Sequence, residues 1–432
     1  MNTYHFIGIG GISMSALAHL VLNCGDIVQG SDIKKSAETE ALERLGVKIF
    51  YGHNKKNVLG ANIVVSSGAI SDSNPELKEA KSLGIKILSR GELLGELSKK
   101  YKIVIAISGA HGKTSTTEML AEIFEYCGKN PTVHLGGISN SFGSNLKIGG
   151  KKFFITEACE YKNSFLNLSP SLGVILNVEP EHLDFFKTFK NVKESFAIFE
   201  KNCKKCIKAT KKRGIYQVFL KNMLFEAKNI SHLGQCHYGY DMFKNNKFLG
   251  KVELGAFGKH NVPNSLCAII AALEYKLPFK KIVEALKNYK GVKRRFEVVA
   301  KSPLIIHDYA HHPTEITKTI TSVRKIPHKR LIVAFQPHTF SRTLNLKNEF
   351  VHALSFCDKL FLIKTYSARE KPLPGGSAKD LAALLPHSTY CGSMEKAFKS
   401  INKTLNPDDI LLILGAGNID ELAEMYKKYD EN

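Results

Sequence analysis

The sequence predicts an α/β protein of three doubly wound domains: a Rossmann-like N-terminal domain, a central P-loop ATPase-type domain and a Rossmann-like C-terminal domain. Two observations support this. Short apolar, β-branched runs alternate with helical patterns along the 432 residues, as in parallel sheets covered by helices. Glycine-rich and polar segments follow the carboxyl ends of these runs, where ligands bind in open α/β sheets. We place the domains at residues 1–99, 100–296 and 297–432.

The central prediction rests on the stretch from residue 101 to residue 120, which follows the pattern strand, glycine turn, Lys-Thr, helix. Glycines let backbone N–H groups approach phosphate oxygens, and the helix N-terminus adds partial positive charge. Lys113 would reach the β- and γ-phosphates, and the Thr114 hydroxyl would bind Mg²⁺. The loop has the short form G-x-x-G-K-T, because Ile107 stands where the longer pattern has its first glycine. An ordinary strand-to-helix turn remains the alternative. The candidate ATP-binding residues are Ser108, Gly109, Ala110, His111, Gly112, Lys113, Thr114 and Ser115.

The N-terminal segment resembles a dinucleotide fingerprint. A strand runs into the glycine turn of Gly8, Gly10 and Gly11, Ser13 takes the place of the third glycine, and a second strand ends at Asp32. This pattern favours a nucleotide diphosphate at a helix N-terminus, with NAD as only one candidate. We expect the helix over residues 16–22 and a further strand over 63–67, which includes Ser66.

Two more strands of the central domain deliver possible metal ligands. The strand at 153–156 leads to Glu157, and the strand at 172–177 leads to a loop that contains His182. Together with Thr114 they would suit Mg²⁺, with Mn²⁺ as a possible substitute. They could equally be polar residues at ordinary loop ends. Asn261 and Asn264 precede an apolar helix over 265–273, and asparagine there is more often a helix cap than a ligand.

In the C-terminal domain, too, polar segments follow the predicted strands. We expect strands at 304–307, 331–335, 359–363 and 410–414. Residues 308–313 follow the first, residues 336–343 follow the second, and a glycine-rich segment at 415–418 follows the last. The domain should therefore be a third doubly wound unit with its ligands at the same edge.

Composition restricts the partners. Hydrophobic residues make up 44% and charged residues 23% of the chain, as in ordinary globular proteins. No run of roughly 20 apolar residues suggests a membrane span, and no signal peptide is visible. The nine scattered cysteines indicate reduced thiols and a cytoplasmic protein; the role of the lone pair Cys203 and Cys206 stays open. The net charge of +21 is dispersed, so we expect small anionic substrates and neither nucleic acid nor membrane as partner.

Taken together, these motifs resemble the Mur ligase family over nearly the full length. The resemblance rests on GIGGISMSALA, GSD, SGAHGKTSTT, EACE, NVEPEHLDFF, GKHNVPNSLCAIIAA, RRFE, HDYAHHPTEI, FQPHTFSRT, YSAREKP and LGAGNID, in that order. It implies an ADP-forming amide ligase with three domains, for a UDP-sugar, for ATP with Mg²⁺, and for an amino acid. The last motifs look like the member that joins L-alanine to UDP-N-acetylmuramate through an acyl phosphate, in peptidoglycan synthesis and hence cell-wall biogenesis, cell shape and division. A muropeptide-recycling relative, which adds a peptide to the same sugar nucleotide, is the alternative.

The resemblance also implies residue roles. The UDP-sugar would contact Gly8, Gly10, Gly11, Ile12, Ser13, Asp32 and Ser66, and ATP would contact residues 108–115, Asn264, Arg295 and Asp308. The alanine would contact Tyr309, His311 and Arg342, and Mg²⁺ would be held by Thr114, Glu157 and His182. The catalytic residues would be Lys113, His182, His311 and Arg342. Three positions depart from the family pattern: Ser13 and Ala110 replace the usual glycine and threonine, and Thr339 replaces a frequent arginine.

Other classes explain less of the sequence. An NAD-dependent oxidoreductase would leave the loop at 108–117 without a role, and a nucleic-acid-binding NTPase would require a clustered basic face. We expect a monomer or a homodimer.

Overall fold

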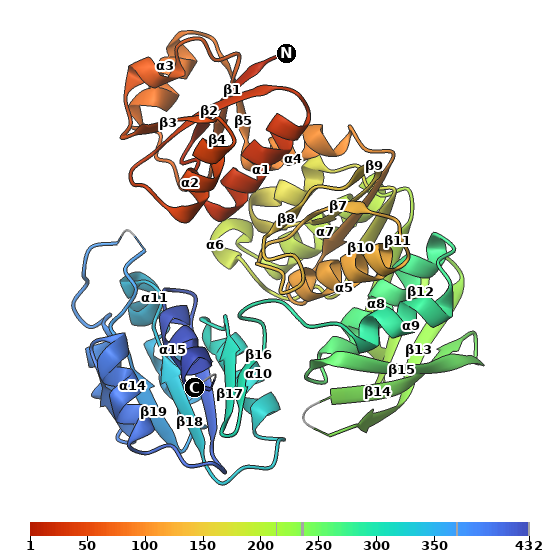
Figure 1. The fold of residues 1–432 in the computed structure, drawn as a ribbon, viewed down its shortest axis with the longest axis vertical. Helices are drawn as coiled ribbons and strands as arrows, with labels where there is room; N and C mark the ends of the chain where they lie inside the picture. The colour runs from red at the N-terminus through yellow and green to blue at the C-terminus, as the bar shows by residue number, and fades with distance from the viewer. Residues whose placement is uncertain (213, 235–236, 369, 431–432) are drawn as a thin grey trace. The chain divides into compact units, whose positions relative to one another are not determined.

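A computed structural model describes residues 1–212, 214–234, 237–368 and 370–430. These residues form three sheets, each with its own helices, as predicted (Figure 1). The first two sheets belong to one compact unit, and the third belongs to a second unit made mainly of residues 291–430. Among the described residues no helix is both long and apolar enough to cross a membrane.

The N-terminal sheet is a five-stranded parallel sheet in the order β3-β2-β1-β4-β5. Its central strand carries Phe6, which is fully buried, because helices cover both faces. The first helix begins at Ile12, directly after the glycine turn, and not at residue 16 as expected. The elements are β1 (Thr3–Ile7), α1 (Ile12–Asn23), β2 (Ile27–Asp32), α2 (Ala37–Arg44), β3 (Lys48–Tyr51), η1 (Lys55–Val58), β4 (Ile63–Ser66), α3 (Pro75–Ser82), β5 (Lys86–Ser89) and α4 (Arg90–Ser98).

The central sheet has ten strands in the order β15-β14-β13-β12-β11-β10-β6-β9-β7-β8. Strands β11, β10, β6, β9 and β7 are parallel; of these, the sequence predicted β6, β9 and β10 but not β7 or β11. An antiparallel extension from β11 through β14 was not predicted. The elements are β6 (Ile103–Ser108), α5 (Lys113–Tyr126), β7 (Pro131–His134), β8 (Leu146–Lys147), β9 (Gly150–Glu157), η2 (Tyr161–Asn167), β10 (Leu172–Ile175), α6 (Leu183–Phe186), α7 (Phe189–Asn202), β11 (Cys206–Lys212), β12 (Ile215–Leu220), β13 (Met223–His232), β14 (His237–Lys244), β15 (Lys247–Phe257), α8 (Asn261–Glu274) and α9 (Phe279–Lys287).

Helix α8 is the most deeply buried helix of the central sheet, and it explains why the sheet can extend. Apart from Pro263 and Leu273, which are partly buried, its apolar residues are buried, including Leu266, Ile269 and Ile270. It contacts both the phosphate-loop helix α5 and strands β11, β12 and β13. A helix that is apolar nearly all round needs partners on several sides, and the antiparallel strands supply one of them.

The C-terminal sheet has six strands in the order β16-β17-β21-β18-β19-β20. Only β16 is antiparallel to its neighbour; the other pairs are parallel. The short edge strands β16 and β20 were not predicted. The elements are β16 (Glu297–Lys301), β17 (Leu304–Asp308), α10 (Pro313–Val323), β18 (Leu331–Phe335), α11 (Phe340–Asn345), α12 (Lys347–Leu354), β19 (Lys359–Leu362), α13 (Ala378–Ala382), β20 (Ser388–Tyr390), α14 (Met394–Asn402), β21 (Ile410–Leu414) and α15 (Asp420–Asp430).

Candidate active site

The glycine loop lies between β6 and α5, at the carboxyl end of a central strand. Gly112 precedes the helix with φ of +84°, and a Cβ there would lie 2.5 Å from Asn264 Oδ1. Only glycine satisfies both the backbone angle and this close approach. Because no side chain caps the start of α5, its first N–H groups face the loop, which is the arrangement that binds phosphate.

Lys113 lies over this loop. Its Nζ donates to Gly109 O at 2.6 Å and to Ala110 O at 3.2 Å. The same ammonium pairs with the Glu160 carboxylate at 3.1 Å. The Glu160 side chain is only 2% exposed, so this is a nearly buried charge pair. The cation is thus held beside the backbone amides that would receive phosphates, with its charge balanced by a carboxylate.

The predicted metal ligands lie on three segments: Thr114 in α5, Glu157 at the end of β9 and His182 just before α6. Glu157 Oε1 accepts a 2.5 Å hydrogen bond from the Gly136 N–H. His182 has its Nε2 3.6 Å from Glu160 Oε1. Within the described ranges no group of three or more His, Cys, Asp or Glu side chains forms a ready metal site. The donors present, a threonine hydroxyl, carboxylates and an imidazole, nevertheless suit Mg²⁺ when phosphate and water complete its shell.

Asn177 fixes the shape of the loop from the end of β10. Its Oδ1 accepts from the His111 N–H at 2.9 Å, and its Nδ2 donates to His111 O at 3.0 Å. The His111 ring lies 3.3 Å from a Glu179 oxygen and 3.4 Å from a Glu181 oxygen. The Ser108 hydroxyl is buried, and the described residues offer it no hydrogen-bond partner, so it is available to a ligand.

Asn261 and Asn264 are not caps of α8, which corrects the expectation from sequence. The helix begins at Asn261, His260 is its N-cap residue, and both asparagines lie in its first turn. Asn264 Nδ2 donates to Asn261 Oδ1 at 3.1 Å, and both side chains are buried. Asn264 Oδ1 lies beside Gly112 of the phosphate loop; its contact with ATP stays a prediction.

The N-terminal sheet brings its candidate residues to one edge. The Gly10 N–H donates to Asp32 Oδ2 at 2.9 Å, so Asp32 shapes the glycine turn. The Ser13 hydroxyl accepts from Arg90 Nη1 at 3.1 Å. Ser66 pairs in register with Ile7, the last residue before the turn. No side chain caps the start of α1 after Gly11, which leaves its N–H groups open to a diphosphate.

In the second unit, Asp308 is used by the backbone. Its Oδ2 accepts from the Phe296 N–H at 2.8 Å and its Oδ1 from the Ala310 N–H at 2.9 Å. Burial raises the pKa of Asp308, although Arg295 and these two hydrogen bonds oppose that shift. The Arg295 guanidinium lies 5.1 Å from the centre of the Tyr309 ring. Predicted ATP and alanine residues are therefore neighbours here.

Arg342 and two histidines form the most distinctive cluster of the second unit. Arg342 Nη1 is buried and, among the described residues, has no hydrogen-bond partner. The His311 and His338 rings lie 5.8 Å apart. The pKa of His338 is lowered to about 4, mainly by burial, with smaller contributions from His311 and Arg342. Burial also lowers the pKa of His311; Glu315 raises it and Arg342 lowers it. A cation with an unsatisfied donor beside neutral imidazoles suits a carboxylate.

The geometry around this cluster is held by its neighbours. His311 Nδ1 lies 3.1 Å from Tyr309 O, which orients the ring. The N-cap of α10 is His312, so His311 does not cap the turn with its side chain. Thr339 begins α11 with φ of +71°, an unusual value for a β-branched residue. Such strain is held in place by surrounding contacts and is typical of functional sites.

Three residues with site contacts received no role from the sequence: Glu160, Asn177 and His338. Each lies in a motif that was recognised, at the end of a predicted strand. Their positions after strand ends indicated that they lie near the site. Their partners, Lys113, His111 and His311, come from other segments, which the sequence alone does not reveal.

Comparisons with known proteins agree with this arrangement. Residues 3–102 match the Mur ligase family, catalytic domain; residues 107–272 match the Mur ligase middle domain; and residues 294–417 match the Mur ligase, glutamate ligase domain. The chain is 39% identical to UDP-N-acetylmuramate–L-alanine ligase of Caldanaerobacter subterraneus subsp. tengcongensis, over 98% of this chain and 96% of the relative. It is 40% identical to the enzyme of the same name of Clostridium acetobutylicum, over 98% and 96%.

Solved structures of ligases are also similar to this chain. The UDP-N-acetylmuramate-alanine ligase of Thermotoga maritima has a TM-score of 0.82 at 25% identity and covers 100% of this chain and 99% of its own. A murein peptide ligase of Psychrobacter arcticus has a TM-score of 0.62 at 20% identity, covering 100% and 99%, and shows the shared fold alone. With all three domains matched in order and close relatives aligned end to end, the chain belongs to the Mur ligase family.

Proposed function

We propose that this protein joins L-alanine to the carboxylate of UDP-N-acetylmuramate with conversion of ATP to ADP, in the synthesis of peptidoglycan precursors. The observation that carries this function is the end-to-end similarity, at 39–40% identity, to ligases of that name. We expect the protein to act in the cytoplasm, on three small-molecule substrates.

The reaction has two steps. A carboxylate is a poor electrophile, so the γ-phosphoryl of ATP is first transferred to it, giving an acyl phosphate and ADP. The amine of alanine then attacks the acyl carbon, and inorganic phosphate leaves as the amide forms. The first unit supplies groups for the first step. Lys113 would offset charge on the phosphates, and the N–H groups of the loop would hold them.

The residues that would hold Mg²⁺ are Thr114, Glu157 and His182, together with the nearby Glu160. The ion would supply further positive charge at the phosphates. Glu160 has a separate part in this proposal. As ATP enters, its phosphates would compete for Lys113, so that the lysine exchanges one anionic partner for another. This exchange would leave the Glu160 carboxylate beside His182, 3.6 Å away, in a position to join the metal.

The second unit supplies groups for the second step. Arg342 would bind the alanine carboxylate through its free N–H groups. His311 would accept a proton from the ammonium, because its lowered pKa keeps it neutral near pH 7. Tyr309 would close one side of this site.

The choice of amine donor tests the proposal. With UDP-N-acetylmuramate and ATP, the purified protein should release phosphate rapidly with L-alanine and far more slowly with a tripeptide. Preference for the tripeptide would assign the chain to muropeptide recycling instead. If neither L-alanine nor the tripeptide leads to phosphate release, both proposed activities are wrong.

A further inference from the structure

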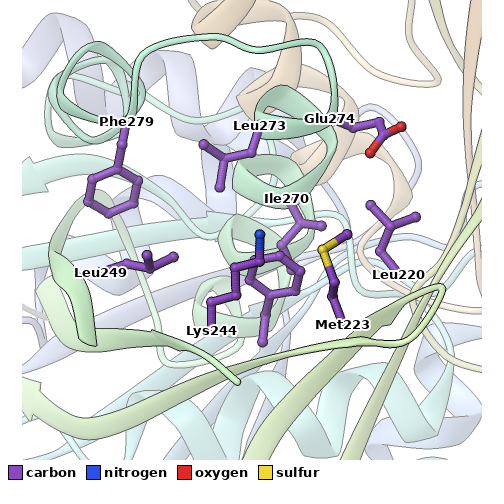
Figure 2. A pocket seen from close by; sticks show the side chains of 9 residues that line it. Leu220, Met223, Lys244, Leu249, Ile270, Leu273, Glu274 and Phe279 are labelled. Carbon is purple, nitrogen blue, oxygen red and sulfur yellow. The ribbon is translucent and has the colours of Figure 1, made fainter. Parts of the chain in front are cut away.

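The central domain contains a cavity of about 340 Å³ that the ligase reaction does not use. It lies between strands β12 to β15 on one side and helices α8 and α9 on the other (Figure 2). Its volume is at the lower end of the range for small-molecule sites, roughly 300–1,000 Å³. Its apolar lining consists of Leu220, Met223, Phe225, Leu249, Ile270, Leu273 and Phe279.

Two charged side chains also line the cavity, and they are not equivalent. Glu274 pairs with Lys205, so its charge is neutralised within the protein. Lys244 has no carboxylate within ion-pair distance in the part of the chain that the structure describes. Its ammonium lies 5.6 Å from the centre of the Phe225 ring, and Figure 2 shows it directed into the space between Leu249 and Met223.

The geometry points to a binding site for a small amphipathic anion, with an apolar body among these side chains and one carboxylate on Lys244. An apolar cavity with one convergent polar group is the usual form of a small-molecule site. The attraction between an anion and a half-buried ammonium next to apolar walls is stronger than at an exposed site, because water screens it less there. A neutral hydrocarbon would leave the lysine without a partner, and a cationic amphiphile would be repelled.

This site is separate from the phosphate loop. Both make contact with helix α8, but at opposite ends. Asn264, in the first turn, faces Gly112, whereas Ile270 and Leu273 line the cavity in the last turns. A ligand in the cavity therefore should not compete with ATP.

Octanoate, below its micelle concentration, is the probe for the experiment, with octanol and octylammonium of equal chain length as comparison ligands. Binding is followed by NMR of the isotope-labelled methyl groups of isoleucine, leucine and methionine in the full chain. We expect octanoate to shift Ile270, Leu249 and Met223 and to bind at least tenfold more tightly than octanol or octylammonium. Saturating ATP should leave that affinity unchanged.

Three variants separate the lysine from the cavity. Lys244→Met should weaken octanoate at least tenfold without altering octanol, and Lys244→Arg should retain the affinity. Lys247→Met, at an exposed position of the next strand, is the matched control and should change nothing. Leu249→Trp, at an exposed position on the rim of the cavity, should fill it and abolish binding of both probes.

The proposal is overturned if octanoate gives no shifts at these methyl groups, if octanol binds as tightly, if Lys244→Met and Lys247→Met behave alike, or if ATP displaces the probe. Each variant is first compared with the parent by its amide spectrum, and folded Lys244→Arg protein provides the reference if Lys244→Met fails to fold.

Discussion

Lys113 and Glu160 form a nearly buried ion pair of 3.1 Å between the phosphate-loop helix and the segment after β9. The carboxylate also lies near His182. An ion pair of this kind is costly to break by removing one partner, since the other charge is then left without compensation. The His182 ring, 3.6 Å from the Glu160 carboxylate, remains beside it when Lys113 is replaced, so we expect a Lys113 variant to fold.

Lys113→Ala should abolish turnover. The lysine is the one cation recorded at the loop backbone among the described residues, and one such electrostatic contact is worth on the order of 3 kcal/mol, or more than a hundredfold in rate. Phosphate release is measured beside circular dichroism melting. Lys129→Ala, at an exposed lysine just after the same helix, is the control and should be fully active. Near-normal turnover by folded Lys113→Ala protein would remove the phosphate-loop assignment.

Glu157→Gln and His182→Ala should each raise the Mg²⁺ concentration that gives half-maximal rate. They come from different strand ends, and each would supply one ligand, so the loss of either weakens the metal site. The measurement is initial rate against Mg²⁺ at saturating ATP. Glu125→Gln, on the exposed face of α5, is the control. The same Mg²⁺ dependence in all three proteins would show that Glu157 and His182 are ordinary polar residues.

Stability should fall as pH rises through the range in which Glu118 titrates. Glu118 is fully buried in α5, where its Oε2 accepts from the Tyr289 hydroxyl at 2.8 Å. Burial raises its pKa from 4.5 to about 7. The folded protein therefore binds more protons than the unfolded chain between these values, and stability decreases from about pH 4.5 to 7. The total loss is on the order of 3 kcal/mol.

Glu118→Gln keeps an acceptor for Tyr289 but cannot ionise, so its stability should lack this decrease. Urea midpoints of the two proteins, measured from pH 4.5 to 8, should approach each other at the acidic end, with the variant gaining as pH rises. Glu125→Gln should follow the parent throughout. A constant difference between the parent and Glu118→Gln would mean that the carboxyl does not titrate in this window.

The sequence predicted most of the parallel strands, including β6, but it missed β7, β11 and β20. A strand covered on both faces, such as β6, is a continuous apolar run. The antiparallel extension has one face in solvent, and β11 (Cys206–Lys212) is rich in exposed lysine, so its pattern resembles a loop. The edge strand β20 (Ser388–Tyr390) is only three residues long and carries little signal.

The site was predicted to the level of the segment but not of the contact. His311 follows β17 and His338 follows β18, and the sheet places β21 between these strands. Both strands pair in register with Leu414 of β21, which sets the two loops at the same height. Such cross-strand proximity depends on strand order, which no local pattern reveals. The pairing of Lys113 with Glu160 likewise depends on β9 lying next to β6 in the sheet.

UDP-N-acetylmuramate, and not NAD⁺, should stabilise the full chain. The start of α1 is open to a diphosphate, which both ligands carry, so the preference for the UDP-sugar rests on the similarity to UDP-N-acetylmuramate–L-alanine ligases. Thermal melting with each ligand decides it, since a ligand at 100 times its Kd adds about 2.7 kcal/mol. Stabilisation by NAD⁺ alone would overturn the UDP-sugar assignment of the N-terminal domain.

Arg342→Lys should raise the KM for alanine far more than the KM for ATP or for UDP-N-acetylmuramate. The guanidinium has a buried N–H group without a partner among the described residues, and it can hold a carboxylate with two parallel hydrogen bonds, which a lysine cannot. Arg324→Lys is the matched control, because Arg324 forms an exposed pair with Asp358; its three KM values should be unchanged.

The same variant should still form the acyl phosphate, because that step precedes the attack by alanine in the proposed reaction. Hydroxylamine, added with ATP and UDP-N-acetylmuramate but without alanine, traps this intermediate as a hydroxamate. Trapping at the parental rate together with a raised KM for alanine would place Arg342 at the amino-acid carboxylate. Loss of trapping with an unchanged KM for alanine would assign Arg342 to the phosphates, and the alanine site would then have to lie elsewhere in the second unit.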